Sequence, residues 1–348
     1  MHWIRIDKTE LDDWNEILKS TDASFFQYPY YASGYEHFFL STPVYLKLVN
    51  EVGNAAEFCT ILKIGYYPLK FGLMIRGPVL LDKTLEVKKV LASIKQFSTA
   101  HKYAFLRINP DAVDIEKALQ QDTDFVQLDY FPAYKGSQSK DFNVYNMPEE
   151  NLIASFRRDC RNKIKFADEL GFVYGFATND AALKEVYELF KSLGENKDFK
   201  YRPYKSYRSI LFNGMKHNLC SVYTAKLNGR MVCAAFIVKD KASFNYFSGA
   251  LLLGNVRAKN SPANKLQYLA IRDCFYKENK PHYNLSYSSP DSGVHMFKDS
   301  FHPQVNEKPL YYTYVINRRV SEFMLHLQQN RLKQIKSFFR RTIKLAKG

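Results

Sequence analysis

The dipeptide Asn228-Gly229 constrains the fold most, because it lies between two segments that both have the composition of strands. These segments are 220–227 (CSVYTAKL) and 231–240 (MVCAAFIVKD). Asn-Gly between two such segments is the strongest short-range signal for a two-residue β-hairpin, since both residues tolerate positive φ. A hairpin makes its strands antiparallel, so the sequence excludes an all-parallel sheet in this part of the chain.

Helical periodicity alternates with strand-like segments in both halves of the chain. Apolar residues recur at helical spacing in some segments and alternate or run continuously in others. Hairpins beside helix–strand steps predict an α/β fold of the α+β type with mixed sheets, and not a doubly wound Rossmann sheet. The predicted strands are 43–50, 55–67, 105–110, 172–178, 220–227, 231–240, 243–251, 282–289 and 311–316, and the predicted helices are 10–19, 83–100, 148–171, 180–194 and 261–280.

A length of 348 residues predicts two domains. The segment 131–141 (FPAYKGSQSKD) mixes Pro, Gly, Ser and charge, and marks the joint between them. We therefore expect a first domain at 1–138, a second at 139–316 that carries the active site, and a basic tail at 317–348.

The charge of the chain predicts polyanionic partners. Lys and Arg number 50 against 35 Asp and Glu, which gives a formal net charge of +15. Such a charge favours tRNA, nucleotide diphosphates, coenzyme A or acidic lipid headgroups. We expect no DNA partner.

The cysteines and the N-terminus predict a cytoplasmic protein. There are five cysteines, an odd number, and none forms a CxxC pair, which argues against a disulfide framework. The N-terminal segment MHWIRIDKTELDDW has no apolar run of the kind found in signal peptides. No stretch approaches 18 apolar residues, so we expect no membrane-spanning helix.

Several catalytic signatures are absent from the sequence. There is no GxxxxGK[ST], no GxSxG and no HExxH. His295 and His302 are seven positions apart, which fits no common zinc spacing, so we expect no metal site.

The segment 292–303 (SGVHMFKDSFHP) contains the pattern FKxxF, with Lys298 between Phe297 and Phe301. A lysine between two aromatic residues can hold a phosphate or carboxylate as a point charge, and in a partly buried pocket it loses its proton more readily. The alternative is that both phenylalanines pack in the core while the lysine reaches solvent.

Six blocks in their order and spacing resemble the FemAB family of peptidoglycan-bridge aminoacyltransferases over about residues 10–316. They include an early aromatic-Gln segment, a strand ending in Arg-Gly-Pro, an Arg-rich helix, a hairpin, a helix beginning at a Pro-containing turn, and FKxxF. The blocks are 24–36, 66–80, 156–171, 223–250, 261–275 and 296–303.

This resemblance implies two tandem GNAT-like acyltransferase domains. It also implies transfer of an acyl group, in FemAB members an amino acid from aminoacyl-tRNA, to an amine on a cell-wall precursor. The lysine of FKxxF is implicated in binding or catalysis in that family, so Lys298 becomes the catalytic candidate with Phe297 beside it. The [QR]xxGx[GA] run of acyl-CoA-binding GNAT enzymes has no match in this sequence.

Further candidates for the binding of substrate come from the chemistry of pockets. A guanidinium close to phenols suits phosphate or sugar recognition, and alternate residues of one strand can share a cleft. The alternatives are packing at the start of a surface helix and burial in the core of a sheet. The candidates are Arg202, Tyr204, Tyr207, Tyr246 and Ser248.

Two basic helices are candidates for polyanion or membrane binding. One predicted helix carries Arg157, Arg158 and Arg161, which could form a patch that binds a polyanion. The alternative is that these arginines only form the solvent-exposed face of the helix. The tail 317–348 carries nine Lys or Arg and one Glu, with apolar residues at helical spacing opposite the cations. The part at 331–348, which includes Arg340 and Arg341, suits an anionic membrane surface, RNA phosphate, or docking on its own domain.

The sequence therefore predicts a FemAB-like acyl- or aminoacyltransferase that acts on a nucleotide- or lipid-linked cell-envelope precursor at the cytoplasmic face of the membrane. We expect no bound cofactor; the donor is aminoacyl-tRNA or acyl-CoA. One alternative is a GNAT-type acyl-CoA-dependent N-acyltransferase that modifies an amino sugar in polysaccharide biosynthesis. Another is a non-catalytic RNA- or membrane-binding protein on the same scaffold.

Overall fold

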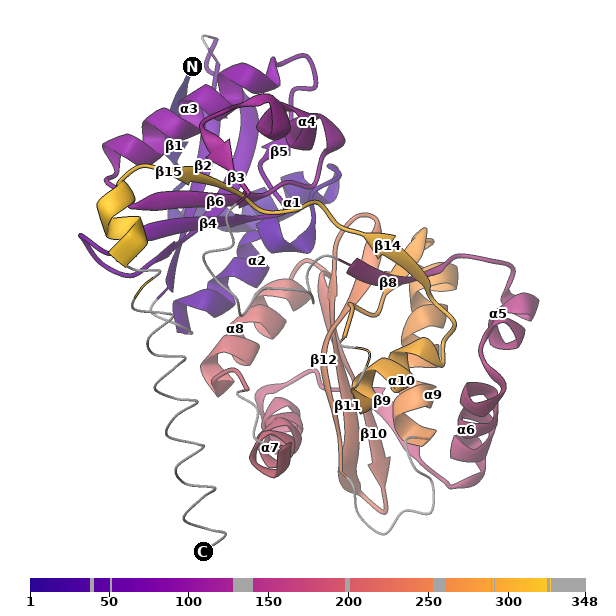
Figure 1. The fold of residues 1–348 in the computed structure, drawn as a ribbon. Coiled ribbons are helices and arrows are strands. Elements are labelled where there is room, and N and C mark those ends of the chain that lie inside the picture. Colours follow the sequence, from indigo (N-terminus) through magenta and orange to yellow (C-terminus); the bar gives the residue numbers. More distant parts are fainter. Residues whose placement is uncertain are drawn as a thin grey trace, which may run out of the picture.

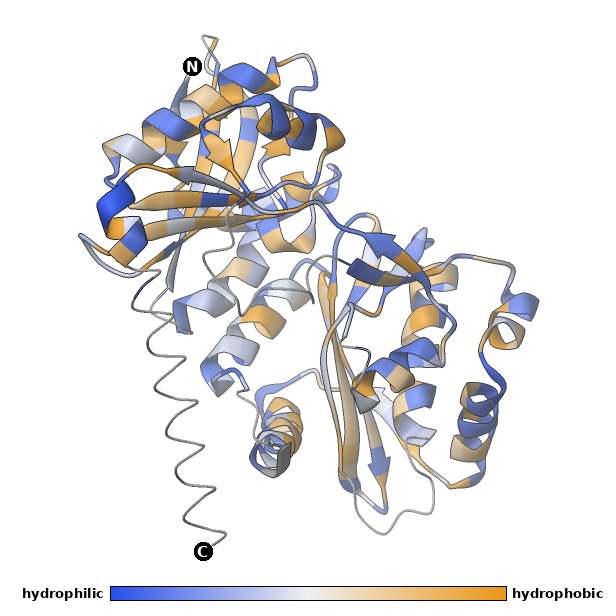
Figure 2. Cartoon of the chain, in the orientation of Figure 1, coloured by the Kyte–Doolittle hydropathy of each residue, from blue (hydrophilic) through white to orange (hydrophobic). Residues whose placement is uncertain are grey.

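The computed structural model describes residues 1–37, 41–50, 52–127, 140–197, 201–252, 261–288, 290, 292–323 and 326. Within these residues the chain forms two mixed β-sheets, each covered by helices (Figure 1). Strands of both sheets are largely hydrophobic, whereas helix α6 (Arg158–Glu169) is strongly hydrophilic (Figure 2).

The first sheet contains eight strands, and one of its pairs, β4 with β6, is parallel. Helices α3 (Val87–Ala100) and α4 (Val113–Gln121) pack on one face through an apolar cluster that includes Leu91 and Ile115. In spatial order the strands are β1 (His2–Arg5), β2 (Ser41–Val49), β3 (Ala55–Ile64), β4 (Phe71–Ile75), β6 (Phe105–Asn109), β15 (Tyr312–Val315) and β7 (Phe125–Val126), with β5 (Val79–Leu80) paired to β3.

The second sheet contains seven strands, and its β12–β13 pair is parallel. The hairpin predicted at Asn228-Gly229 is confirmed, because β10 and β11 pair antiparallel up to Leu227↔Arg230. In spatial order the strands are β14 (Gln304–Glu307), β8 (Lys140–Tyr145), β13 (His282–Asn284), β12 (Ser243–Leu251), β11 (Arg230–Lys239), β10 (Cys220–Leu227) and β9 (Val173–Phe176).

Helices cover both faces of the second sheet. Helices α7 (Asp180–Lys197) and α8 (Tyr204–Met215) pack on one face. The other face is covered by α5 (Glu149–Ser155), α6, α9 (Ser261–Arg272) with its π-helical turn (Asp273–Lys277), and α10 (Gly293–Asp299).

The two units share one hydrophobic core at their junction, built from α1 (Leu11–Lys19) and α2 (Pro29–Ala32) on one side and α8 and β11 on the other. The Tyr30 hydroxyl is fully buried there. It donates to the carbonyl oxygen of Lys239 at 2.8 Å and accepts from the amide of Lys239 at 3.2 Å. Burial of apolar surface and satisfied polar groups together fix this contact. Short 3₁₀ turns lie nearby at Lys8–Glu10, Phe25–Gln27 and Ser33–His37.

Two sequence blocks of the family resemblance meet inside the first unit. The side chain of Gln27, fully buried, donates to the carbonyl oxygen of Ile75 at 2.5 Å and accepts from the amide of Thr60 at 2.8 Å. A Cβ at Gly77 would lie 2.6 Å from this side chain, so only glycine fits beside it. The Arg-Gly-Pro turn is therefore shaped by contact with the early glutamine.

The structure corrects three details of the predicted organisation. The strand at 312–315, placed in the second domain, pairs with β6 of the first sheet, so the chain returns to its first unit. The single helix predicted at 148–171 is two helices, because Phe156 and Arg157 are extended. The joint predicted at 131–141 lies mostly outside the described residues.

Candidate active site

Strand β12 separates from its parallel neighbour β13 after a short stretch of pairing. The two strands pair only from Ser243↔His282 to Asn245↔Asn284, while β12 continues to Leu251. Beyond Asn245 the described residues give β12 no strand partner on this side. The edge of a strand presents unpaired backbone N–H and C=O groups, which suit the binding of an extended polar ligand.

A pocket of about 220 Å³ lies beside this separated part of β12. Strand residues form its floor, α9, α10 and Leu193 of α7 form its walls, and the lining is mostly apolar, as in small-molecule sites. The lining residues are Leu193, Cys233, Ala234, Ala235, Tyr246, Gly249, Ala250, Leu251, Ala263, Leu266, Gln267, Gly293, Val294 and Phe297.

Helix α10 carries the FKxxF pattern to the wall of this pocket. Ser292 caps the helix by accepting a hydrogen bond from the amide of His295 at 3.1 Å, which satisfies a free N–H at the helix start. Phe297 lines the pocket, and Phe301 is buried against Phe156 with ring centroids 5.2 Å apart. The two aromatics thus differ: one faces the pocket and the other anchors the segment in the core.

Lys298 is buried behind the pocket, with 6% of its surface exposed. Its Nζ donates to the carbonyl oxygen of Ser286 at 3.0 Å and lies 5.7 Å from the centroid of the Tyr246 ring. Ser286 adopts a φ of 56°, an uncommon conformation for a residue with a side chain. The alternative in which Lys298 reaches solvent is therefore wrong.

Burial lowers the pKa of Lys298 to about 8. Asp141 opposes this shift by its negative charge, whereas the nearby Lys308 adds to it. The ammonium form consequently predominates at neutral pH but is lost within a pH range that an enzyme assay can reach.

Tyr246 separates Lys298 from the pocket. Its hydroxyl lies so close to Gly249 that a Cβ there would be 2.1 Å away, so the glycine leaves room for the phenol. Among the described residues the hydroxyl has no hydrogen-bond partner. Burial raises the pKa of Tyr246 above its usual value, so the phenol stays protonated and can donate a proton or a hydrogen bond.

The other predicted pocket residues lie on the opposite face of the second sheet. A register shift in β12 between its partners Phe236 and Ile237 accommodates Phe247, and the hydroxyls of Tyr207 and Ser248 lie 3.4 Å apart on that face. Tyr204 donates to Asp180 at 2.7 Å and joins α8 to α7.

Arg202 lies within a set of aromatic rings near the junction of the two units. Its guanidinium carbon is 4.6 Å from the Tyr35 centroid and 4.9 Å from that of Phe247. The cation is held by ring faces from both units, which is favourable for guanidinium groups. The structure thus divides the predicted site residues into a Lys298–Tyr246 group and an Arg202 group, on two sides of one sheet.

The comparisons with known proteins concern the fold. A family model described as "Acetyltransferase (GNAT) domain" matches residues 154–284. The crystal structure of FemX superposes with a TM-score of 0.75 at 15% identity, covering 93% of this chain and 100% of that one. No curated protein sequence matches the chain.

Two further solved structures share the arrangement. The C-terminal domain of a protein described as a lysylphosphatidylglycerol synthetase from Agrobacterium fabrum gives a TM-score of 0.58 at 10% identity, covering 92% of this chain and 95% of that one. A tandem GNAT protein from the clavulanic acid biosynthesis pathway gives 0.51 at 10% identity, with 90% and 97% covered. The chain is an acyltransferase of the tandem GNAT-like fold.

Two of the five arginines predicted to bind polyanions instead hold parts of the second unit together. Arg157 pairs with the Asp299 carboxylate at 2.7 Å, which ties α6 to α10. Arg161 donates to the carbonyl oxygen of Phe156 at 2.6 Å, at the break between α5 and α6. Arg158 is exposed. Arg340 and Arg341 lie outside the described residues, so the prediction for the tail stays a prediction.

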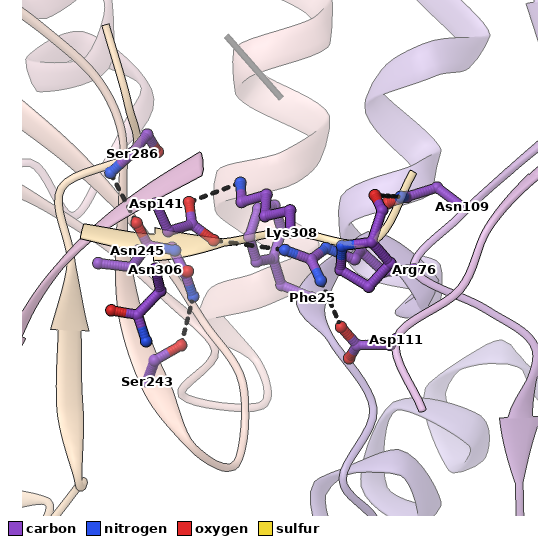
Figure 3. Close-up of polar contacts among 12 residues, drawn as sticks. Phe25, Arg76, Asn109, Asp111, Asp141, Ser243, Asn245, Ser286, Asn306 and Lys308 are labelled. Carbon is purple, nitrogen blue, oxygen red and sulfur yellow. Dashed lines mark hydrogen bonds and ion pairs between the residues drawn. The ribbon is translucent and has the colours of Figure 1, made fainter. Parts of the chain in front are cut away.

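A cluster of charged residues at the junction was not predicted as a site (Figure 3). Asp141 of β8 pairs with Lys308 at 2.5 Å and with Arg76 at 3.3 Å, and Arg76 also pairs with Asp111 at 2.8 Å. Only Arg76 belongs to a feature noted in the sequence, the strand ending in Arg-Gly-Pro. No local pattern brings these residues together, because pairing of distant strands does so.

The described residues contain no group of three His, Cys, Asp or Glu side chains placed to hold a metal ion. All five cysteines are buried and free of disulfide bonds. Within the same described ranges, no helix is both long enough and apolar enough to cross a bilayer.

Proposed function

We propose that this acyltransferase moves an aminoacyl or acyl group from an activated ester or thioester to an amine of a nucleotide- or lipid-linked cell-envelope precursor. The observation that carries the proposal is the placement of Tyr246, with a protonated hydroxyl on the pocket side and the buried Lys298 ammonium 5.7 Å from its ring. FemX and the protein described as a lysylphosphatidylglycerol synthetase share the fold and support the substrate class.

In the proposed reaction the acceptor nitrogen bonds to the carbonyl carbon of the donor, and the bond from that carbon to the donor oxygen or sulfur breaks. The departing atom needs a proton, and the amine must lose one. The Tyr246 hydroxyl supplies a proton to the departing atom, and the resulting phenolate takes the proton that the acceptor nitrogen loses, directly or through water. The positive charge of Lys298 stabilises the negative charge that develops on the departing atom, because Lys298 lies close to Tyr246.

The edge of β12 supplies the remaining requirement, which is to position the donor. Backbone N–H groups of residues 246–251 on the side away from β11 are available to hold an amide or an ester carbonyl. Phe297 and Leu251 provide apolar walls for the acyl group. This explains how an acyltransferase works without a motif of the Ser-His-Asp kind.

The donor distinguishes the proposal from its nearest alternative. The tandem GNAT protein of the clavulanic acid pathway is named in relation to AcCoA, which favours an acyl-CoA donor as the second candidate. Purified enzyme with an amine-bearing nucleotide- or lipid-linked precursor should be supplied separately with aminoacyl-tRNA and with acyl-CoA. We expect product from aminoacyl-tRNA; thioester consumption alone would favour the N-acyltransferase, and no product from either donor would overturn the enzymatic function.

The role of Lys298 is tested in the same assay. We expect Lys298→Met to lower the turnover by at least about tenfold, which corresponds to about 1.4 kcal/mol of transition-state stabilisation. Unchanged turnover in a folded variant would remove the lysine from the mechanism while leaving the acyltransferase function intact.

A further inference from the structure

A basic and aromatic surface lies at one end of the first sheet. Three segments form it: the loop between β3 and β4, the loop between α3 and β6, and the helical segment 318–323 that follows β15 (Figure 1). We call it the β3–β4 surface. Its members are Lys63, Tyr66, Tyr67, Lys70, Lys102, Arg318, Arg319 and Phe323.

Hydrogen bonds and packing make these three segments one continuous surface. The amide of Ala104 donates to the Lys70 carbonyl oxygen at 2.7 Å, and the amide of Asn317 donates to the Ala104 carbonyl oxygen at 2.8 Å. Val320 of the helical segment packs beside Phe71 and Phe105. The surface is thus a fixed feature of the folded unit and not a chance approach of mobile loops.

Like charges are concentrated on the two loops of this surface, while Arg318 of the helical segment pairs with Glu322 at 2.8 Å. Among the described residues, Lys63, Lys70 and Lys102 form no ion pair with an Asp or Glu. Other lysines of the first unit, such as Lys8, Lys47 and Lys95, do form such pairs. The pKa of Lys70 is lowered by burial and by the charges of Lys63 and Lys102. Mutual repulsion of this kind is relieved by an anionic partner.

Two aromatic rings project from the same surface. Tyr66 and Tyr67 are 72% and 71% exposed, whereas the other tyrosines that the structure describes are buried or half-buried, and Phe323 is 51% exposed. The Nζ of Lys102 lies 5.9 Å from the Tyr67 centroid. Adjacent exposed aromatic rings flanked by cations are typical of surfaces that meet a partner.

We propose that the β3–β4 surface contacts an anionic lipid bilayer. Tyrosine rings lie at the headgroup level of a membrane, with an apolar body below and a hydroxyl in water, and lysines reach the phosphates beside them. Each such lysine adds to the attraction of the anionic surface. Planar guanidinium groups suit bidentate contacts with RNA phosphate, whereas the cations of the two loops are lysines, which act as point charges. The guanidinium of Arg318 is held by Glu322 at 2.8 Å.

The experiment compares full-length variants in flotation with vesicles of equimolar phosphatidylcholine and phosphatidylglycerol. We expect Lys63→Glu with Lys102→Glu to reduce binding by at least about tenfold. We expect Tyr66→Ser with Tyr67→Ser to reduce it several-fold. The matched control is Lys88→Glu with Lys89→Glu, which makes the same change in net charge at the opposite end of α3, about 20 Å away along the helix.

Three outcomes would overturn the proposal. Both surface variants could bind vesicles as well as the unaltered chain does, which would show that other basic segments cause the binding. The control pair could weaken binding equally, which would mean that only net charge matters. The chain could bind single-stranded poly(U) through these residues and ignore the vesicles, which would make the surface a nucleic-acid site. Melting temperatures of the variants should match that of the unaltered chain, because the substituted side chains are exposed or half-buried.

Discussion

The Nζ of Lys308 lies 2.5 Å from Oδ1 of Asp141, and Lys308 belongs to the segment in which the chain crosses from β14 of the second sheet to β15 of the first. The other carboxylate oxygen of Asp141 pairs with Arg76 of the first unit at 3.3 Å (Figure 3). One carboxylate therefore neutralises a cation from each side of the junction. Its charge also reaches Lys298, whose pKa it raises against the effect of burial.

We expect Asp141→Asn to destabilise the protein by about 3 kcal/mol, because Lys308 and Arg76 are then left buried with too little negative charge. Denaturant unfolding measures this change. The matched control is Asp159→Asn, which removes an exposed i,i+4 pair with Lys163 and should cost under about 1 kcal/mol. If both variants lost the same free energy of unfolding, the ion pairs of Asp141 would contribute no more to stability than an exposed pair does.

Gly249 tests the position of Tyr246. A methyl group at residue 249 would meet the tyrosine hydroxyl, so we expect Gly249→Ala to displace the phenol and to lower turnover about as much as Tyr246→Phe does. Gly175→Ala serves as the control on β9, since its Cβ would meet nothing nearer than the Thr224 hydroxyl at 3.8 Å. Full activity in the Gly249 variant would mean that the hydroxyl has no role in transfer.

Glu57 should make the stability of the protein depend on pH. The side chain is fully buried on β3, both of its oxygens lack partners among the described residues, and burial raises its pKa to about 9. A raised pKa in the folded state means that stability is complete below the ordinary pKa of 4.5 and is lost as the pH rises toward 9.

The comparison with Glu57→Gln isolates this effect. Relative to the variant, the unaltered chain should lose about 1.4 kcal/mol of unfolding free energy per pH unit between pH 5 and 9. Chemical denaturation at several pH values measures the slope. Parallel curves for the two proteins would contradict the assignment of a neutral buried carboxyl group.

The sequence predicts local elements well where one residue type dictates the backbone. Asn228-Gly229 predicts the β10–β11 hairpin, and Ser261 with Pro262 predicts the start of α9, because turn and cap chemistry are local. The break at Phe156 was missed, since it depends on the Arg157 amide donating to the Ser300 carbonyl oxygen at 3.0 Å from a distant segment.

The candidate site was predictable only in part, because some of its contacts join segments that are distant in the sequence. The FKxxF pattern and the family resemblance pointed to Lys298, and strand alternation pointed to Tyr246. Neither could place Asp141 beside Lys308, because that contact depends on how β8 pairs with β14. Tyr207 and Ser248 were grouped with Tyr246, but the register shift in β12 turns Ser248 to the other face, where Tyr207 lies on α8.

The most direct test of the account is the pH dependence of kcat/KM for the unaltered chain divided by that for Lys298→Arg with the same donor and acceptor. The ratio cancels the titration of the acceptor amine, and arginine keeps its charge throughout. The account predicts that the ratio is constant below neutral pH and falls as the pH rises through about 8, where Lys298 loses its proton. A ratio that stays flat, or that rises through this range, would contradict the role of a charged Lys298 behind Tyr246.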